Sequence, residues 1–120
     1  MARILLAEDE DVLRMLIVDT LEEYGYEIDV ASDGIEAMEK IEGSLYDLAI
    51  LDYMMPGLTG IEVIEKIRQH PVHHSLKTMI VTAKSQKSDE ERAKLAGADY
   101  FIRKPFSPLV LSKLVKEILT

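Results

Sequence analysis

Five short apolar runs alternate along the chain with five longer stretches in which apolar residues recur at helical spacing. This alternation is typical of βα repeats that build a parallel sheet with helices on both faces, so the pattern predicts an α/β fold. Strands are expected near residues 3–7, 27–31, 47–51, 78–82 and 99–103. The segments 48–51 and 79–81 are continuously apolar, as expected for parallel strands that helices cover on both sides.

Three of the longer stretches carry apolar residues that return to one face of a helix. These stripes are Val12, Met15 and Leu16; Ile61, Ile64 and Ile67; and Leu111, Leu114, Val115 and Ile118. Each stripe is expected to pack on the sheet. The segment 88–96 has little apolar stripe, which predicts a helix that holds the sheet loosely.

Helix starts are marked by capping sequences. The segments 59–62 and 88–91 both have the Ser/Thr-x-x-Glu spacing of a capping box. Ser107 precedes Pro108, which places a capping residue before a first-turn proline. Helices are therefore expected to begin at these three places.

Length and composition narrow the class of protein. A chain of 120 residues predicts a single domain over 1–120 with one core, and 48% hydrophobic with 30% charged residues is typical of a globular protein. No apolar run approaches the roughly 18 residues of a membrane span, and the start of the chain lacks a secretory leader, so a cytoplasmic protein away from membranes is expected. The absence of cysteine excludes thiolate and disulfide chemistry. A formal net charge of −8 disfavours direct nucleic-acid binding.

Polar residues stand at the ends of four of the five predicted strands. In open α/β sheets, ligands bind beyond the carboxyl ends of the strands, so these residues are expected to share one site. They are Glu8 and Asp9 after the first strand, Asp52 after the third, Thr82 at the end of the fourth and Lys104 after the fifth.

Three carboxylates at one sheet edge repel each other, by about 4 kcal/mol for a pair of unit charges 4 Å apart at an effective dielectric constant near 20. A hard divalent cation offsets this repulsion, and Mg²⁺ is typically held by one or two protein carboxylates together with phosphate oxygens. A carboxylate nucleophile, a metal, a lysine and a hydroxyl are the groups that phosphoryl transfer requires. The strand ends therefore indicate phosphoryl-transfer chemistry.

Each residue also has a purely structural interpretation. The acidic run 8–11 suits the first turn of a helix, and Asp52 suits a turn between a strand and a loop. Thr82 alone reads as a strand residue and Lys104 as a surface lysine, so only their coincidence favours a site. The histidines at 70, 73 and 74 are interpreted as solvated loop residues, since no cysteine or carboxylate lies among them to complete a metal site.

Four motifs, taken together and in order, resemble the receiver domains of response regulators over residues 3–119. They are Ile-Leu-Leu-Ala-Glu-Asp-Glu at 4–10, Leu-Asp-Tyr-Met-Met-Pro-Gly-Leu-Thr-Gly at 51–60, Val-Thr-Ala at 81–83 and Gly-Ala-Asp-Tyr-Phe-Ile-Arg-Lys-Pro-Phe at 97–106. The resemblance implies a flavodoxin-like (βα)5 fold, a doubly wound parallel sheet with strand order 2-1-3-4-5.

The resemblance also implies roles for individual residues. Asp52 matches the phosphoacceptor, Asp9 a direct Mg²⁺ ligand, Glu8 a ligand through water and Met54 a ligand by its backbone carbonyl. Glu8 departs from the aspartate of many members, and its longer side chain changes its reach. Lys104 matches the lysine that pairs with the phosphoryl group, and the bond to the following proline matches the family's cis peptide.

Three further residues, and Met54 again, match switch and lifetime positions. Thr82 matches the hydroxyl that hydrogen-bonds the new phosphoryl group, and Phe101 matches the aromatic ring that moves inward as the threonine moves. Phe101 lacks the hydroxyl that some members carry there, which leaves a packing switch. Met54 and Lys84 match positions that border the path of the hydrolytic water, and the apolar Met54 predicts slow dephosphorylation.

The resemblance implies a signalling switch rather than an enzyme, with intrinsic autophosphorylation and autodephosphorylation. Its implied partners are a sensor histidine kinase or histidine phosphotransfer protein and a downstream target or a removed output domain, and it implies a possible phosphorylation-dependent homodimer. Two alternatives stay open. An aspartate-nucleophile phosphatase of the dehalogenase type places a second aspartate where this chain has Met54, and a pure interaction module keeps the fold without phosphorylation.

Overall fold

A five-stranded parallel sheet forms the centre of the molecule. In a computed structural model, which describes residues 1–83 and 87–120, the strands run in the order β2-β1-β3-β4-β5. Their bounds are β1 (Arg3–Ala7), β2 (Glu27–Ala31), β3 (Leu48–Asp52), β4 (Lys77–Thr82) and β5 (Tyr100–Arg103). The predicted α/β fold, the strand order and the strand positions to within one residue are confirmed.

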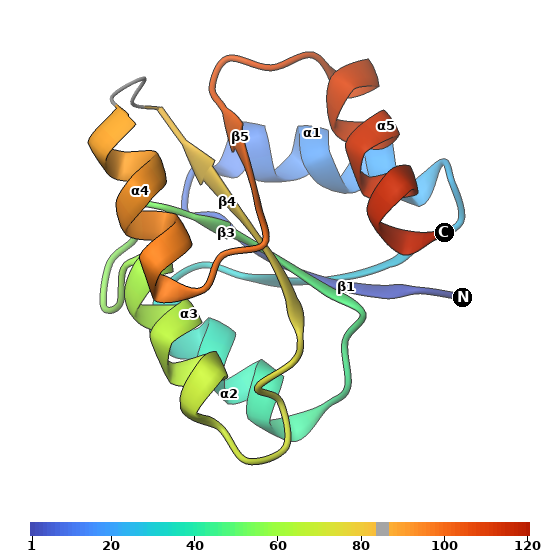
Figure 1. Ribbon diagram of the computed structural model, residues 1–120. Helices are drawn as coiled ribbons and strands as arrows, with labels where there is room; N and C mark the ends of the chain where they lie inside the picture. The colour runs from blue at the N-terminus through green and yellow to red at the C-terminus, as the bar shows by residue number, and fades with distance from the viewer. Residues whose placement is uncertain (84–86) are drawn as a thin grey trace.

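Helices cover both faces of the sheet, with α1 and α5 on one face and α2, α3 and α4 on the other (Figure 1). Their bounds are α1 (Asp11–Glu22), α2 (Gly34–Gly43), α3 (Gly60–Gln69), α4 (Lys87–Ala96) and α5 (Pro108–Leu119). Neighbouring residues of β3 serve opposite faces, as a two-residue period requires. Ile50 packs with Ile17 and Val115 in one core, whereas Leu51 packs with Ile64 in the other.

The apolar stripe predicted for α1 was wrong. Val12 and Met15 are 77% and 63% exposed, and Leu16 is also exposed, whereas Ile17 and Leu21 are buried. The helix α1 has more apolar residues than one face can hold. The stripe that contains Val12, Met15 and Leu16 therefore overlaps in the sequence with the stripe that contains Ile17 and Leu21. Periodicity alone does not decide which of two such stripes faces the sheet.

Two of the three predicted helix starts are confirmed. Thr59 forms a reciprocal capping box, because its Oγ1 accepts the backbone N–H of Glu62 at 3.2 Å and its own N–H donates to Glu62 Oε1 at 2.9 Å. Ser107 caps α5 in the expected way. The box predicted at Ser88 was wrong, because α4 begins at Lys87 and Ser88 is already helical.

The helix α4 has few apolar contacts with the rest of the molecule. Among its described side chains, Ala93 and Asp89 are buried, and Leu95 is 88% exposed. An ion pair between Glu90 and Arg103 links the helix to β5. The weak apolar face is confirmed, and the loose hold on the sheet stays a prediction.

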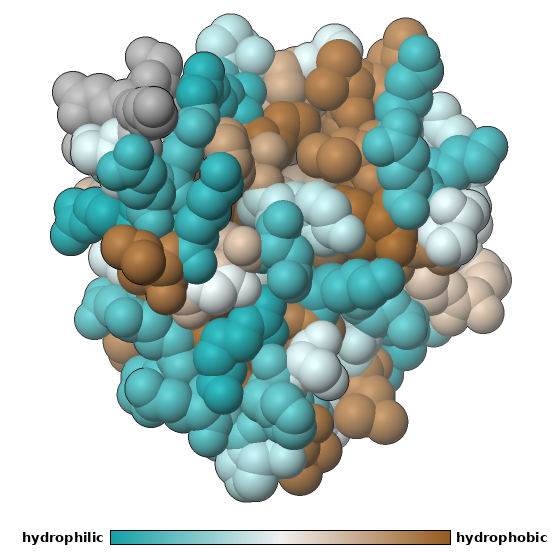
Figure 2. Space-filling model, viewed as in Figure 1, coloured by the Kyte–Doolittle hydropathy of each residue, from teal (hydrophilic) through white to brown (hydrophobic). Residues whose placement is uncertain are grey.

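Apolar surface gathers around α5 in the upper right of Figure 2. Leu109 and Val110 at the start of this helix are 58% and 53% exposed.

Within residues 1–83 and 87–120, no helix combines the length and the apolar character that crossing a bilayer requires.

Candidate functional site

Three acidic residues meet at the carboxyl ends of two adjacent strands. Asp52 is the last residue of β3 and is 5% exposed, and Glu8 directly follows β1 and is 1% exposed. Asp9 is exposed, and one carboxylate oxygen from each of the three residues lies within 4.8 Å of the others. The predicted convergence of these carboxylates is therefore confirmed.

A glycine allows α3 to begin close to the acidic strand end. The N–H of Gly60 donates to the carbonyl of Tyr53 at 3.0 Å. A Cβ atom on Gly60 would lie 2.5 Å from the backbone oxygen of Asp52, which is closer than van der Waals contact permits. This close approach buries the end of β3 under the helix.

Lys104 supplies a positive charge to the acidic group. Its Nζ lies 3.3 Å from Asp52 Oδ2 and 3.4 Å from Glu8 Oε1, and its side chain is 20% exposed. The peptide bond to Pro105 is cis, as the resemblance implies. Burial lowers the pKa of Lys104, but the negative charges of Asp52 and Glu8 outweigh burial and raise the pKa above its usual value.

The surroundings of Glu8 disfavour the charged form of its carboxyl group. The pKa of Glu8 is raised from 4.5 to about 7, chiefly because the carboxyl group is buried and also because of the neighbouring charge of Asp52. A hydrogen bond from the backbone N–H of Glu10, 3.0 Å long, and the charge of Lys104 act in the opposite direction. The net effect is that the protonated form of Glu8 persists to a higher pH than that of an ordinary glutamate.

The acidic group fits a magnesium ion. Its donors are carboxylate oxygens, which Mg²⁺ prefers. Glu8 Oε1 is buried with Lys104 Nζ 3.4 Å away as its ion-pair partner, and as a carboxylate oxygen it can also accept a hydrogen bond from a metal-bound water. Glu8, Asp9 and Asp52 would hold the ion, whose charge would offset the repulsion among the three carboxylates.

We expect Mg²⁺ affinity to increase by about tenfold between pH 6 and pH 8, because only about one-tenth of Glu8 is ionised one pH unit below a pKa of about 7. In the metal-free protein the raised pKa makes the unfolding free energy fall as pH rises from 4.5 through about 7. Isothermal titration calorimetry at pH 6, 7 and 8 measures the affinity. Glu8→Gln should remove most of this pH dependence, and an affinity that is equal at pH 6 and 8 in the parent would contradict the assignment.

The other predicted site residues have different environments. Thr82 ends β4 and is 3% exposed, and Phe101 is half-buried on β5. The side chain of Met54 is 60% exposed, and the metal contact of its carbonyl stays a prediction. The prediction for Lys84 lies outside the described residues.

Arg14 contacts the candidate site although the sequence did not indicate a role for it. Its Nη1 donates to the backbone carbonyl of Glu8 at 2.8 Å, and its Nη2 donates to Asp11 Oδ1 at 2.5 Å. The spacing of Asp11 and Arg14 would have indicated a surface ion pair, but no pattern in the sequence indicates a bond from this arginine to a carbonyl in the preceding loop.

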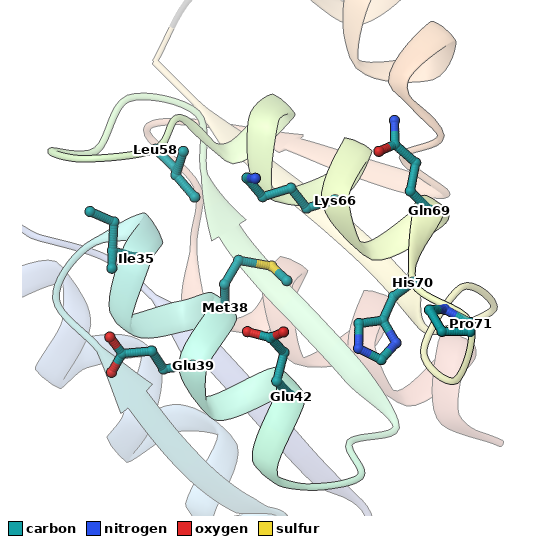
Figure 3. A pocket seen from close by; sticks show the side chains of 9 residues that line it. All are labelled: Ile35, Met38, Glu39, Glu42, Leu58, Lys66, Gln69, His70 and Pro71. Carbon is teal, nitrogen blue, oxygen red and sulfur yellow. The ribbon is translucent and has the colours of Figure 1, made fainter.

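The histidine segment lies away from the acidic residues. His70 Nδ1 accepts the backbone N–H groups of Val72 and His73 at 3.1 and 3.3 Å, which makes this ring part of the turn. His70 also lines a surface hollow of about 380 Å³ between α2 and α3, together with Met38 and Glu42 (Figure 3). None of the predicted site residues lines this hollow.

Comparison with known proteins identifies the family. The family model of the response regulator receiver domain matches residues 4–116. This chain belongs to that family. The receiver domain resembles the phosphate regulon transcriptional regulatory protein PhoB of Rhizobium meliloti, with 38% identity over 98% of this chain and 52% of the relative. It spans about half the length of the curated relatives it matches first.

Two solved structures share the fold of this receiver domain. The chemotaxis response regulator CheY4 of Vibrio cholerae superimposes with a TM-score of 0.94 at 30% identity, over 99% of both chains. The receiver domain of a sensor histidine kinase from Pseudomonas aeruginosa PAO1, which has a magnesium ion coordinated in its active-site cleft, gives a TM-score of 0.90 at 28% identity, over 98% of this chain and 97% of that one. The chain is thus a receiver domain of two-component signalling, which is a switch rather than a conventional enzyme.

Proposed function

We propose that this receiver domain accepts a phosphoryl group on Asp52 in a Mg²⁺-dependent reaction and passes the change to a partner through α4, β5 and α5. The observation that carries the proposal is the meeting of Asp52, Glu8 and Asp9 within 4.8 Å, with Lys104 Nζ 3.3 Å from Asp52. This arrangement combines a nucleophile, a cation site and a fixed positive charge in one pocket.

The proposed donor is a phosphohistidine on a histidine kinase or a phosphotransfer protein. An oxygen of the Asp52 carboxylate attacks the phosphorus, the P–N bond breaks, and the leaving imidazole keeps the electron pair and takes up a proton. The product is an acyl phosphate. Lys104 Nζ, which pairs with Asp52 beforehand, stabilises the negative charge of the transferring group.

The cofactor of the reaction is Mg²⁺. When bound, it neutralises charge on the phosphoryl oxygens. Asp9 and Asp52 would supply direct carboxylate ligands, Glu8 would act through water, and the carbonyl of Met54 would complete the protein's contribution. The buried Glu8 Oε1 and the magnesium ion in the Pseudomonas receiver domain support this assignment.

Phosphorylation changes the surface through Thr82 and Phe101. The hydroxyl of Thr82, at the end of the strand next to Asp52, gains the phosphoryl group as a hydrogen-bond partner. The half-buried ring of Phe101 then moves inward, and α4 shifts because few apolar contacts hold it. The altered α4-β5-α5 surface binds a downstream target or an output domain, or forms a homodimer.

Acetyl phosphate tests the proposal without a kinase. We expect the protein to gain one phosphoryl group in the presence of Mg²⁺, as measured by intact mass, and none after chelation of the metal. Hydroxylamine should remove the group, since it cleaves acyl phosphates. No gain together with no Mg²⁺ binding would favour the pure interaction module, and steady turnover of small phosphomonoesters would favour a phosphatase.

The residue at position 54 is expected to set the lifetime of the phosphoryl group. Met54 borders the proposed path of the hydrolytic water and cannot orient water by hydrogen bonding, whereas an amide can. We expect Met54→Asn to lose its phosphoryl group roughly tenfold faster than the parent. Intact mass at timed intervals after donor removal measures the loss, and an equal or slower loss in the variant would contradict the role.

A further inference from the structure

Arg14 is hydrogen-bonded to the loop between β1 and α1, residues 8–10, which carries Glu8 and Asp9. Its side chain is 20% exposed, and its guanidinium joins α1 to the segment 8–11 through two hydrogen bonds. One goes from Nη1 to the carbonyl oxygen of Glu8 at 2.8 Å. That carbonyl belongs to the peptide group linking Glu8 to Asp9, so the bond restrains the plane from which the Asp9 side chain projects.

The loop needs this restraint because α1 lacks a capping side chain. Glu10 is the N-cap residue and makes no side-chain cap hydrogen bond, whereas Asp33, Thr59 and Ser107 cap α2, α3 and α5. Without a cap, the chain between β1 and α1 is less constrained at its helical end. The bond from Arg14 to the Glu8 carbonyl does not cap the free N–H groups of α1, but it ties the preceding segment to the first turns of the helix.

The other restraints on the loop act on different atoms. The N–H of Glu8 donates to the carbonyl of Ala31 at 3.1 Å, and the N–H of Glu10 donates to Glu8 Oε2 at 3.0 Å. These bonds place the start of the loop and the side chain of Glu8. The Glu8 carbonyl lies in the peptide group between Glu8 and Asp9. Within the described residues, Arg14 is the residue whose side chain donates a hydrogen bond to this carbonyl.

We propose that Arg14 is a positioning residue for the Mg²⁺ site, which it orders through the Glu8 carbonyl without contacting the ion. The inference rests on the proposed function, because it concerns the same site. By its position Arg14 would increase the Mg²⁺ affinity, whereas its positive charge alone would decrease it. A cationic side chain near a divalent cation repels it, so removing the charge alone would strengthen Mg²⁺ binding.

Two variants of Arg14 separate position from charge. Arg14→Met keeps a long helix-forming stem but loses the charge and both hydrogen bonds, and we expect its Mg²⁺ dissociation constant to rise about tenfold. Arg14→Lys keeps the charge but loses the planar fork, and its dissociation constant should rise by a smaller factor of about three. The control is Asp19→Asn, which leaves both hydrogen bonds of Arg14 in place and removes the carboxylate of an exposed residue of α1, so its affinity should stay within about twofold of the parent.

Calorimetric Mg²⁺ titration of the four proteins is combined with thermal unfolding and with amide NMR spectra of the metal-free proteins. Weaker Mg²⁺ binding by Arg14→Met, with shifted Asp9 and Glu10 amide resonances before any metal is added, supports the positioning role. Equal or tighter binding by Arg14→Met overturns it, and so does a lower melting temperature with unchanged affinity, which indicates a purely structural role. If the parent itself binds no Mg²⁺, the proposed function fails together with this inference.

Discussion

Asp52→Asn is expected to take up no phosphoryl group from acetyl phosphate under conditions that phosphorylate the parent, a loss of roughly a thousandfold or more in rate. The Asp52 carboxylate oxygen is the proposed nucleophile, and the amide that replaces it would not form an acyl phosphate. The substitution preserves the shape of a side chain that is 7% exposed, so the fold should be retained. Intact mass after incubation with Mg²⁺ and acetyl phosphate measures the uptake.

Two further aspartate variants make this result specific. Asp19 is an exposed residue of α1, and Asp19→Asn should be phosphorylated like the parent. Asp9→Asn keeps the nucleophile but removes a proposed metal ligand, so it should be phosphorylated slowly and require more Mg²⁺. Phosphoryl uptake by Asp52→Asn at the parent's rate would place the acceptor on another residue.

Arg68→Ala is expected to lower the free energy of unfolding by about 3–5 kcal/mol. Arg68 lies at the end of α3 that is remote from the acidic residues, with a side chain 23% exposed. It donates to the carbonyls of His74, Leu76 and Gly97 at 2.6–3.0 Å, and Nη2 also pairs with Asp99 at 2.9 Å. Truncation leaves these acceptors without their donor and separates α3 from the starts of β4 and β5.

Urea unfolding of the parent and the variant measures this effect, and Arg92→Ala is the matched control. Arg92 is an exposed arginine of α4, so its removal should change the unfolding free energy by less than about 0.5 kcal/mol. Below the unfolding transition, Arg68→Ala should still accept a phosphoryl group, because Arg68 makes no contact with the site residues in the described part of the chain. A loss below about 1 kcal/mol would contradict the role assigned to Arg68.

The strand positions and the candidate site could be predicted because both depend on local pattern and one general rule. Continuous apolar runs such as 48–51 identify buried parallel strands, and the carboxyl ends of such strands meet at one edge. That rule predicts a shared site for Asp52, Glu8 and Lys104, and the three side chains do meet in the structure. Motif order added the strand arrangement, which the sheet confirms.

The sequence by itself therefore determined the fold class, the strand order and the residues of the acidic pocket. Only the tertiary structure decided which face of α1 is buried, that the pKa of Glu8 is raised to about 7, and that Arg14 and Arg68 bond to backbone carbonyls. The physical reason is that these properties depend on the orientation of side chains relative to atoms contributed by other segments. Gly97, for example, is 29 positions from Arg68, and residue periodicity carries no information about such contacts.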